Sequence, residues 1–578
     1  MLDYKKAPFN LGDEEIKWVE DTFKELNDFQ KVNQVIIDMA WSPEEKDLKN
    51  DVAKHNFGGY RYHNTSAESL FNQNSIIQKG KIPALIAANV EGGGDGGVKG
   101  GTKIGDPVAL AATGNPENAY YMAYYGCKEA AAVGCNWTFS PIVDIDINWR
   151  NCIISNRSFG QDTDTVLEFS KEYLRGAKDA GVECCMKHFP GDGCDDRDQH
   201  LCVTINDLST KDWDKTFGKV YKGMIDAGVS SIMVGHMVLP SYQKKFRPEL
   251  KDEDLMPATL APELLQDLLR DQLGFNGLVI TDATHMLGLT ATIPRREFMP
   301  GVIMAGCDMV LFMRDTDEDI KYMMDALEDG RLTRERLDEA VKNVLAYKAM
   351  MKLPKKQKDN TIMPSADARS IIGCIEHKEK AKQILDESIT LVKNTRKQLP
   401  LDPIKHKNVI VYSATTASAV AKLAGNAPVE KKLVDALNAR GFNAELYKLN
   451  PLKLVTRKGL NGKKLLSGTP IEEFNKKYDA CFLICDVTGY SESNGRSIKW
   501  KIPMGPEIPW YVTELPTVVI STAWPFHLHD LPMVPTYINT YNSSELAIEM
   551  TVDKIIGKSE FKGVSPVDAF CGSWDTKK

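Results

Sequence analysis

The chain has 578 residues, of which 43% are hydrophobic and 26% charged, and its formal net charge at pH 7 is −7. A chain of this length exceeds the ~250–300 residues that one hydrophobic core supports, so we expect two or more domains. The modest negative charge and the scattered Lys and Arg residues argue against a nucleic-acid-binding protein, whose phosphate contacts need clustered basic residues.

The composition also argues against export and membrane insertion. The first residues, Met1 to Lys6, are polar and lack the apolar stretch of a secretory signal. No uninterrupted apolar run reaches the ~18 residues of a membrane span. The 12 cysteines are scattered and form no Cys-x-x-Cys pair, which is typical of reduced thiols. We therefore expect a cytoplasmic protein without a membrane partner.

Strand-like and helix-like segments alternate over the first 350 residues. After an opening helix at 13–26, the apolar runs predict strands at 35–37, 82–88, 137–143, 184–186, 230–234, 278–281 and 309–312. Helical spacing predicts helices at 116–133, 167–180, 211–226, 262–272, 295–304, 317–328 and 334–350. This alternation predicts a (β/α)8-type TIM barrel over residues 1–352, with a doubly wound sheet as the competing architecture.

A second domain follows a short connection. Residues 353–367 are rich in Lys and Pro, and we place an inter-domain linker at 353–375. Residues 376–578 then show a second α/β pattern, which predicts a C-terminal α/β sandwich domain. Its predicted strands are 409–412, 480–483, 517–520 and 536–539, and its predicted helices are 376–389, 416–424 and 430–439.

Polar side chains follow the predicted strands of the first domain. Each member of this set stands directly after an apolar strand: Asn89, Glu91, Asp144, His188, His236 and Asp282. The carboxyl ends of barrel strands converge on one rim, where α/β-barrel enzymes keep their chemistry. We therefore expect these side chains to meet around one ligand.

Two acidic positions suggest acid–base chemistry at this rim. Asp282 ends a strand and could act as a nucleophile, with a turn or helix-capping aspartate as the alternative. Asp198 lies two residues before His200 on a loop, so it could orient that histidine as a general acid and base. A solvated acidic loop with an incidental histidine is the competing interpretation.

Two further motifs give weaker signals. The loop set His188, Asp192, Cys194, Asp198 and His200 contains metal-ligand types, but its spacing follows no recognised zinc or calcium pattern. Gly92, Gly94 and Gly97 formally satisfy GxGxxG, yet no helix opens on that loop as a dinucleotide site requires. We favour a close backbone approach to a polar ligand there.

The order of short motifs along the chain resembles glycoside hydrolase family 3, especially its β-N-acetylglucosaminidase branch. The motifs that carry the resemblance are Phe57-Gly58-Gly59, Glu91-Gly92-Gly93, Arg157-Ser158-Phe159-Gly160, Lys187-His188-Phe189-Pro190-Gly191, Asp198-Gln199-His200, Leu273-Gly274-Phe275-Asn276-Gly277 and Thr281-Asp282-Ala283. The resemblance extends through Glu387-Ser388 and Leu399-Pro400-Leu401 into the second domain.

This resemblance implies a retaining mechanism with a covalent glycosyl-enzyme. Asp282 matches the nucleophile, and His200, held by Asp198, matches an unusual acid/base pair. The side chains that match or adjoin sugar-holding positions are Arg157, Lys187, His188, Asn89, Asp192 and His236. No metal or organic cofactor is implied.

Two positions depart from the family pattern and concern sugar recognition. Asn89 stands where the family usually has an aspartate, so an ionised acceptor for sugar hydroxyls is lost. Asp192 stands where the loop usually reads Gly-His-Gly.

The expected function is removal of terminal β-linked N-acetylglucosamine from a small carbohydrate, such as an oligosaccharide or a cell-wall fragment. A phosphorylase is one alternative, because a histidine leaves no fixed negative charge near an incoming phosphate. A β-glucosidase is another, and it would need a second-domain carboxylate such as Asp486 or Glu492. A sugar-binding protein without catalysis is the third.

Overall fold

The chain folds into two compact units. The computed structural model describes residues 2–40, 44–416, 427–448, 470–488, 491, 493–501, 505 and 507–578. The first unit comprises Met1–Pro107 and Pro116–Lys382, and the second comprises Val108–Asn115 and Gln383–Lys578. The expected linker, 353–375, lies in the first unit and includes helix α15 (Leu353–Lys358). The boundaries 1–352, 353–375 and 376–578 stay a prediction.

The first unit is a closed barrel of parallel strands, which confirms the TIM-barrel prediction. Its strands are β1 (Ile36–Ala40), β2 (Gly59–Tyr62), β3 (Leu85–Ala88), β4 (Trp137–Thr138), β5 (Glu183–Phe189), β7 (Ser231–Val234), β9 (Leu278–Ala283) and β10 (Met309–Leu311). They close in the order β1-β10-β9-β7-β5-β4-β3-β2.

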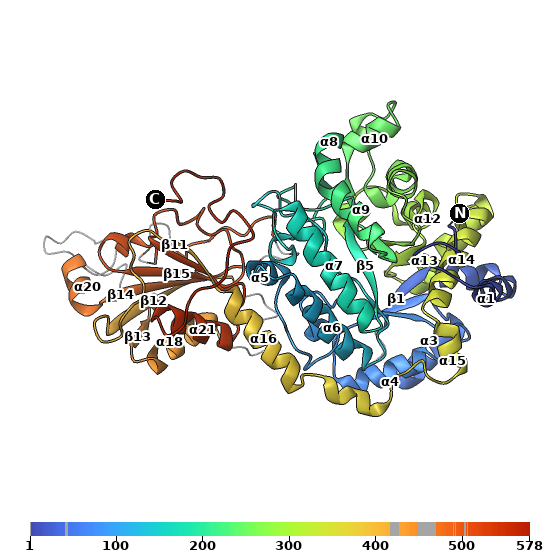
Figure 1. The fold of residues 1–578 in the computed structure, drawn as a ribbon. Helices are drawn as coiled ribbons and strands as arrows, with labels where there is room; N and C mark the ends of the chain where they lie inside the picture. The colour runs from blue at the N-terminus through green and yellow to red at the C-terminus, as the bar shows by residue number, and fades with distance from the viewer. Residues whose placement is uncertain are drawn as a thin grey trace. The chain divides into compact units, whose positions relative to one another are not determined.

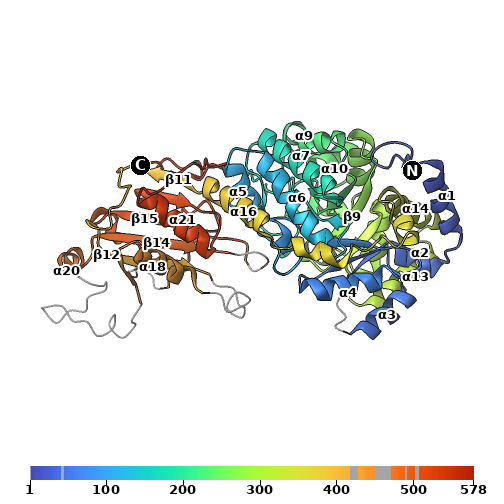
Figure 2. The ribbon, with the colours of Figure 1, turned by 60° about the horizontal axis from the view of Figure 1, so that its bottom comes forward.

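Helices surround this barrel (Figures 1 and 2). They are α1 (Asp13–Lys24), α2 (Asp28–Gln34), α3 (Glu45–Lys54), α4 (Ala67–Ile77), α6 (Glu117–Ala131), α7 (Thr163–Asp179), α9 (Lys219–Asp226), the π-type helix Glu263–Gln272, α12 (Arg295–Ala305), α13 (Thr316–Asp329) and α14 (Arg334–Met350). Because the helices cover the outside of the barrel, β3, β7, β9 and β10 are buried at every residue.

Capping side chains set several helix starts, and one explains a difference from the prediction. The Asp162 side chain accepts a hydrogen bond from Thr165 N, so α7 begins at Thr163 rather than at 167. Thr333 caps α14 in the same way, and Asp315 caps α13. An N-cap lies outside the apolar periodicity and is easily missed by it.

Two strands differ from the predictions. The strand β2 was not predicted, because paired glycines disfavour strands. Gly58 is nonetheless required just before it, since a Cβ there would lie 1.9 Å from the Gln34 carbonyl oxygen. The strand predicted at 137–143 ends at Thr138. Pro141 has no N–H group with which to extend the ladder.

The second unit contains a six-stranded sheet, in agreement with the predicted α/β domain. The strands β11 (Thr390–Asn394), β12 (Asn408–Thr415), β13 (Asn443–Leu446), β14 (Ala480–Asp486), β15 (Thr517–Ser521) and β16 (Thr536–Asn539) lie in the order β11-β16-β15-β14-β12-β13. Only β11 is antiparallel to its neighbour.

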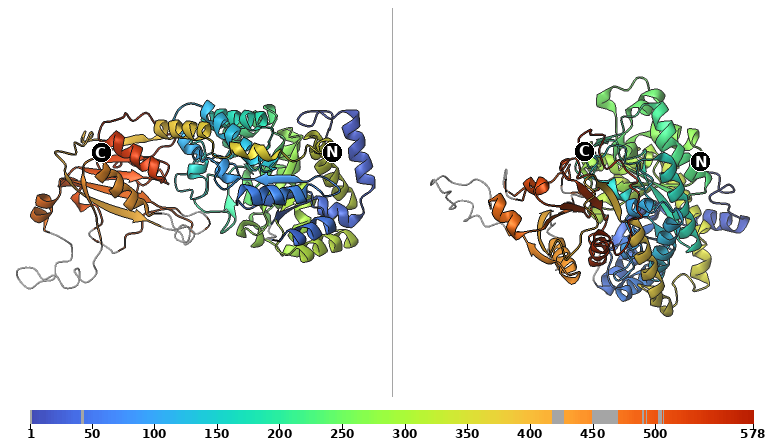
Figure 3. Two further views of the ribbon diagram at one scale, coloured as in Figure 1. Left: turned by 90° about the horizontal axis from the view of Figure 1, so that it is seen from below. Right: turned by 60° about the vertical axis from the view of Figure 1, so that its left-hand side comes forward.

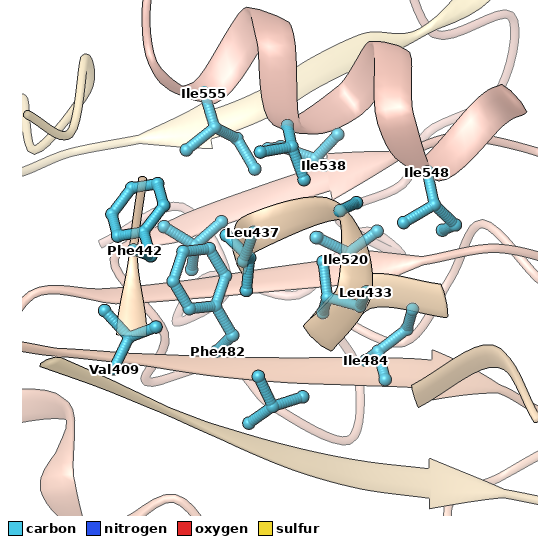
Figure 4. Packing of buried hydrophobic residues seen from close by; sticks show 14 of the residues in the cluster. Val409, Leu433, Leu437, Phe442, Phe482, Ile484, Ile520, Ile538, Ile548 and Ile555 are labelled. Carbon is cyan, nitrogen blue, oxygen red and sulfur yellow. The ribbon is translucent and has the colours of Figure 1, made fainter. Parts of the chain in front are cut away.

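Both faces of this sheet are buried. Helices α18 (Val429–Ala439) and α21 (Glu545–Ile555) cover one face with Leu433, Leu437 and Ile548 (Figures 3 and 4). A second apolar cluster, which includes Phe474 and Tyr511, covers the other face. The helix predicted at 416–424 lies outside the described residues beyond Thr416.

Among the described residues, no helix combines the length and the apolar character needed to span a bilayer.

The buried carboxyl of Asp38 on β1 predicts a pH-dependent loss of stability. Burial, together with the nearby charges of Asp51 and Asp319, raises the pKa of Asp38 to about 7. The unfolded-state pKa is ~3.9, so the folded protein binds the proton more tightly and loses stability as pH rises from ~4 through ~7. Asp38→Asn removes this loss, and its stability relative to the parent should increase over that range by up to ~4 kcal/mol.

Urea unfolding at pH 4, 6 and 8 measures this effect. The matched control is Asp47→Asn, at an exposed position on α3, for which no pH-dependent gain is expected. If the free energy of unfolding relative to the parent changes equally with pH in the two variants, the explanation given for Asp38 is wrong.

Candidate active site

A buried carboxylate, Asp144, organises the rim of the barrel. It follows β4 and is fully buried. Its Oδ2 lies 2.6 Å from His188 Nδ1, and its Oδ1 accepts from the backbone N–H of Asp192 at 2.8 Å. With the ring proton of His188 on Nδ1, its other nitrogen, Nε2, faces Asp282 and lies 3.8 Å from Asp282 Oδ2.

Asp282 is held as a carboxylate inside β9. Burial alone would raise its pKa, but the positive potentials of His188, His236 and His200 outweigh burial and lower it. Its Oδ1 accepts from Ala283 N–H at 2.7 Å. Asp282 is therefore ionised at neutral pH, at the barrel end where three histidines surround it.

Asp198 and His200 are in direct contact. Asp198 is fully buried, and its Oδ1 accepts from His200 N at 2.8 Å and lies 2.7 Å from His200 Nδ1. With the proton of the ring on Nδ1, the half-buried imidazole has Nε2 for proton exchange.

Glu91 joins two of the predicted sugar-holding residues. Its carboxylate accepts from Arg157 Nε and Nη2, each at 3.0 Å, and from Lys187 Nζ at 2.7 Å. Burial would raise the pKa of Glu91, but the two cations outweigh burial and hold it well below its usual range. The carboxylate therefore stays ionised and fixes both cationic side chains at the rim.

Two of the predicted sugar-holding residues have protein partners instead. His236 is fully buried; its Nδ1 lies 3.0 Å from Thr259 Oγ1 and its Nε2 lies 3.0 Å from the Ala283 carbonyl oxygen. Asp192 is buried as well, and both of its carboxylate oxygens accept from protein N–H groups. Both side chains therefore bond to neighbouring segments of the protein, and their part in sugar binding stays a prediction.

Asn89 differs from these two. Its Oδ1 is buried and has no hydrogen-bond partner within the described part of the chain. A buried acceptor without a donor costs free energy, and a donor from a bound ligand would remove that cost.

The glycine-rich loop packs closely against other groups of the protein. A Cβ on Gly96 would lie 1.9 Å from the Asn89 carbonyl oxygen, and one on Gly94 would lie 1.9 Å from Glu129 Oε2. Glu129 in turn accepts from Thr102 N at 2.6 Å. The expected backbone approach is present, but its partners are Asn89 and Glu129, and the glycines keep the loop close to them.

Several supporting residues were not singled out from the sequence. Asp144 and Glu91 were expected only as rim residues, and their strand-end positions were the available signal. Asn151 and Gln199 bond to Asp192, and nothing local in the sequence indicates that. His285, exposed beside Phe312 with ring centroids 6.0 Å apart, was also missed.

The sequence also left open a metal site and a catalytic carboxylate from the second domain. The described residues contain no group of three His, Cys, Asp or Glu side chains arranged to hold a metal ion. Asp486 ends β14, and its Oδ1 accepts from Thr522 Oγ1 at 2.6 Å. Glu492 lies outside the described residues.

Comparisons with known proteins agree with this fold. Residues 28–347, more than half of the chain, match the model of the "Glycosyl hydrolase family 3 N terminal domain". The "Beta-N-acetylglucosaminidase/beta-glucosidase" of Cellulomonas fimi is 38% identical over 577 residues, which cover 100% of both chains.

Two solved structures are similar over nearly the whole chain. "Beta-glucoside phosphorylase BglX" is 36% identical with a TM-score of 0.91, and the match covers 100% of both chains. A family 3 β-N-acetylglucosaminidase from Paenibacillus sp. str. FPU-7 is 23% identical with a TM-score of 0.76, over 95% of this chain and 100% of that one. The second likeness concerns the fold alone.

The barrel, the site at its carboxyl rim and these matches define the class of protein as a glycoside hydrolase. The chain belongs to glycosyl hydrolase family 3.

The charge cluster at Glu91 predicts a large cost for Glu91→Gln. The amide cannot balance Arg157 and Lys187, and breaking a buried ion pair by removing one partner typically costs ~3–5 kcal/mol. Thermal unfolding followed by circular dichroism should show a Tm several degrees below that of the parent.

The matched control is Glu45→Gln. Glu45 pairs with Lys49 at the surface, where solvent screens the interaction, and Tm should change little. Equal shifts of Tm in the two variants would be inconsistent with the structural role given to Glu91.

Proposed function

We propose that this glycoside hydrolase is a retaining, exo-acting enzyme that removes terminal β-linked N-acetylglucosamine. The observation that carries the proposal is the presence of two groups in one site. One is an ionised Asp282, and the other is His200, whose ring is held by the buried Asp198. A nucleophile and an acid/base group are what a two-step glycosyl transfer needs.

In the first step, an Asp282 carboxylate oxygen attacks the anomeric carbon. The bond from that carbon to the leaving oxygen breaks, and His200 Nε2 donates its proton to that oxygen. In the second step, His200 Nε2 takes a proton from water as the water attacks the anomeric carbon. The bond to Asp282 then breaks and the sugar leaves with its configuration retained. The scheme uses side chains alone and requires no cofactor.

Four residues are proposed to hold the sugar: Arg157, Lys187, His188 and Asn89. Arg157 and Lys187 both donate hydrogen bonds to the Glu91 carboxylate. His188 lies between Asp144 and Asp282. The free acceptor of Asn89 supports a contact with a sugar hydroxyl. The name of the Cellulomonas fimi relative, which includes both N-acetylglucosaminidase and glucosidase, supports the choice of sugar and leaves glucose as the competing one.

Removing the nucleophile and removing the acid/base group should have different signatures. Asp282→Asn should lower kcat/KM at least ~10³-fold for every aryl β-N-acetylglucosaminide, because no covalent bond can form. His200→Ala should lower kcat/KM ~10²-fold or more for 4-methoxyphenyl and little for 2,4-dinitrophenyl leaving groups, since only the former needs protonation.

Release of the aryl alcohol measures both effects. The control is His406→Ala, at a second-unit histidine whose Nδ1 lies 3.2 Å from the Asp402 carbonyl oxygen, and its activity should equal that of the parent. Full activity of His200→Ala on the methoxyphenyl substrate would refute the assignment of the acid/base group.

Phosphorolysis is the second candidate for the same site. It is favoured by the likeness to "Beta-glucoside phosphorylase BglX" at 36% identity over the whole chain. It is also favoured by the use of a histidine, which carries no fixed negative charge against a phosphate dianion. In this variant a phosphate oxygen attacks the anomeric carbon of the glycosyl-enzyme in place of water. The bond from that carbon to the Asp282 oxygen breaks, which releases a glycosyl 1-phosphate and the free Asp282 carboxylate.

Product analysis separates hydrolysis from phosphorolysis. If water is the acceptor, 4-nitrophenyl β-N-acetylglucosaminide and the matching β-glucoside should give free sugar at the same rate with and without 10-fold excess phosphate over substrate. If phosphate is the acceptor, ³¹P NMR should show a glycosyl phosphate, and turnover should rise with phosphate. Free sugar as the sole product in phosphate buffer would remove the second candidate.

A further inference from the structure

A buried bridge between Asp192 and Gln199 lies beside the acid/base pair. Asp192 is 3% exposed and Gln199 is 1% exposed. The Oδ1 atom of Asp192 accepts from Gly193 N at 2.7 Å and from Asn151 Nδ2 at 3.1 Å. Its Oδ2 accepts from Gln199 Nε2 at 3.1 Å. Protein donors therefore engage both side-chain oxygens of Asp192, a residue that the sequence had suggested for sugar binding.

The orientation of the Gln199 amide follows from its other contact. The side-chain oxygen lies 2.8 Å from the backbone nitrogen of His236, and a backbone N–H can only donate. The oxygen must therefore face His236, and the NH₂ group must face Asp192. The backbone carbonyl of Gln199 also accepts from Gly288 N at 3.0 Å.

This bridge fixes the segment that carries the proton-transfer pair. Gln199 is the residue between Asp198 and His200, and the carbonyl of His200 accepts from Leu287 N at 3.1 Å. The segment 198–200 is thus tied to the loop that follows Asp282, and through Asp192 to the loop that follows β5. A displacement of ~1 Å in a catalytic group can cost ~10²-fold in rate.

We propose that Asp192 is a positioning residue that sets the placement of His200 through the side-chain amide of Gln199. It would not contact the substrate. The inference rests on the proposed function, because it presupposes that His200 transfers the proton to the leaving group.

The donor and acceptor pattern makes an aspartate necessary at this position. An amide introduced at 192 has one oxygen and one NH₂ group. In one orientation the amide oxygen faces the donors of Gly193 and Asn151, and the new NH₂ group then faces the NH₂ group of Gln199. In the other orientation the oxygen faces Gln199, and the new NH₂ group then faces the donors of Gly193 and Asn151. No orientation satisfies all three contacts, so Asp192→Asn should release Gln199 without changing the size of either side chain.

The same logic predicts a rescue. In the double variant Asp192→Asn/Gln199→Glu, the NH₂ group at position 192 donates to the carboxylate at position 199. The second carboxylate oxygen still accepts from His236 N. The reversed bridge restores each of the contacts that the parent side chains make at 192 and 199, so we expect the position of the segment to be restored.

The test compares aryl N-acetylglucosaminides with poor and good leaving groups. Asp192→Asn should lower kcat/KM about 10- to 100-fold for 4-methoxyphenyl and less than about threefold for 2,4-dinitrophenyl. The double variant should return the first value to within about threefold of the parent. Asp196→Asn, at an exposed acid of the same loop, is the control and should behave as the parent.

Equal losses on both substrates, a rise in KM alone, or no recovery in the double variant would overturn the positioning role. Tm of each variant is measured alongside. If Asp192→Asn does not fold, Gln199→Met breaks the other end of the bridge and serves for the same comparison. Failure of the proposed function would be seen separately, because His200→Ala would then show no dependence on the leaving group.

Discussion

The hydrogen bonds accepted by Asp144 are the constraint on which the rest of the site depends. One fully buried carboxylate orients the ring of His188 and holds the backbone of Asp192. A buried charge is tolerated only when donors surround it, so this carboxylate requires both neighbours to stay in place. The direction of His188 toward Asp282 and the start of the loop toward His200 both follow from it.

The proposed nucleophile lies on β9, and the proposed acid/base pair lies on the loop between β5 and β6 (Thr204–Ile205). Backbone hydrogen bonds connect the two segments. Leu287 N and Gly288 N donate to the carbonyls of His200 and Gln199 at 3.1 and 3.0 Å. His236, expected as a ligand contact, supports the same region through the Ala283 carbonyl. Buried polar groups that are fully paired give a rigid site, and the proposed two-step transfer, which uses one histidine in both steps, requires such rigidity.

The barrel and its rim could be predicted because their signals are local. Apolar runs predicted the strands β5 and β9. The separation of two residues between Asp198 and His200 predicted that the two side chains are in contact. The partners of Asp192 and His236 could not be predicted in this way. Asn151 and Thr259 are distant in the sequence, and only the fold decides which N–H or hydroxyl group reaches a buried side chain.

Three local features were not predicted correctly from the sequence pattern: the strand β2, the start of α7 and the contacts of the glycine-rich loop. The strand β2 directly follows Gly58, where a Cβ would meet the Gln34 carbonyl oxygen. The start of α7 depends on the Asp162 cap rather than on periodicity. The glycine-rich loop after β3 suggested a ligand, whereas its glycines accommodate Asn89 and Glu129. At Gly58 and in the glycine-rich loop, packing against a distant segment determined the outcome; at α7 a local hydrogen bond did.

The central claim is that Asp282 forms a covalent bond to the sugar, and trapping that bond tests it most directly. The protein would be treated with 5-fluoro-N-acetylglucosaminyl fluoride and, in parallel, with 2-deoxy-2-fluoroglucosyl fluoride, whose glycosyl-enzymes turn over slowly. Intact-mass and peptide analysis should then show one added sugar on the peptide that contains Asp282. Complete inactivation with the sugar on a different residue, or turnover without any covalent adduct, would contradict the account.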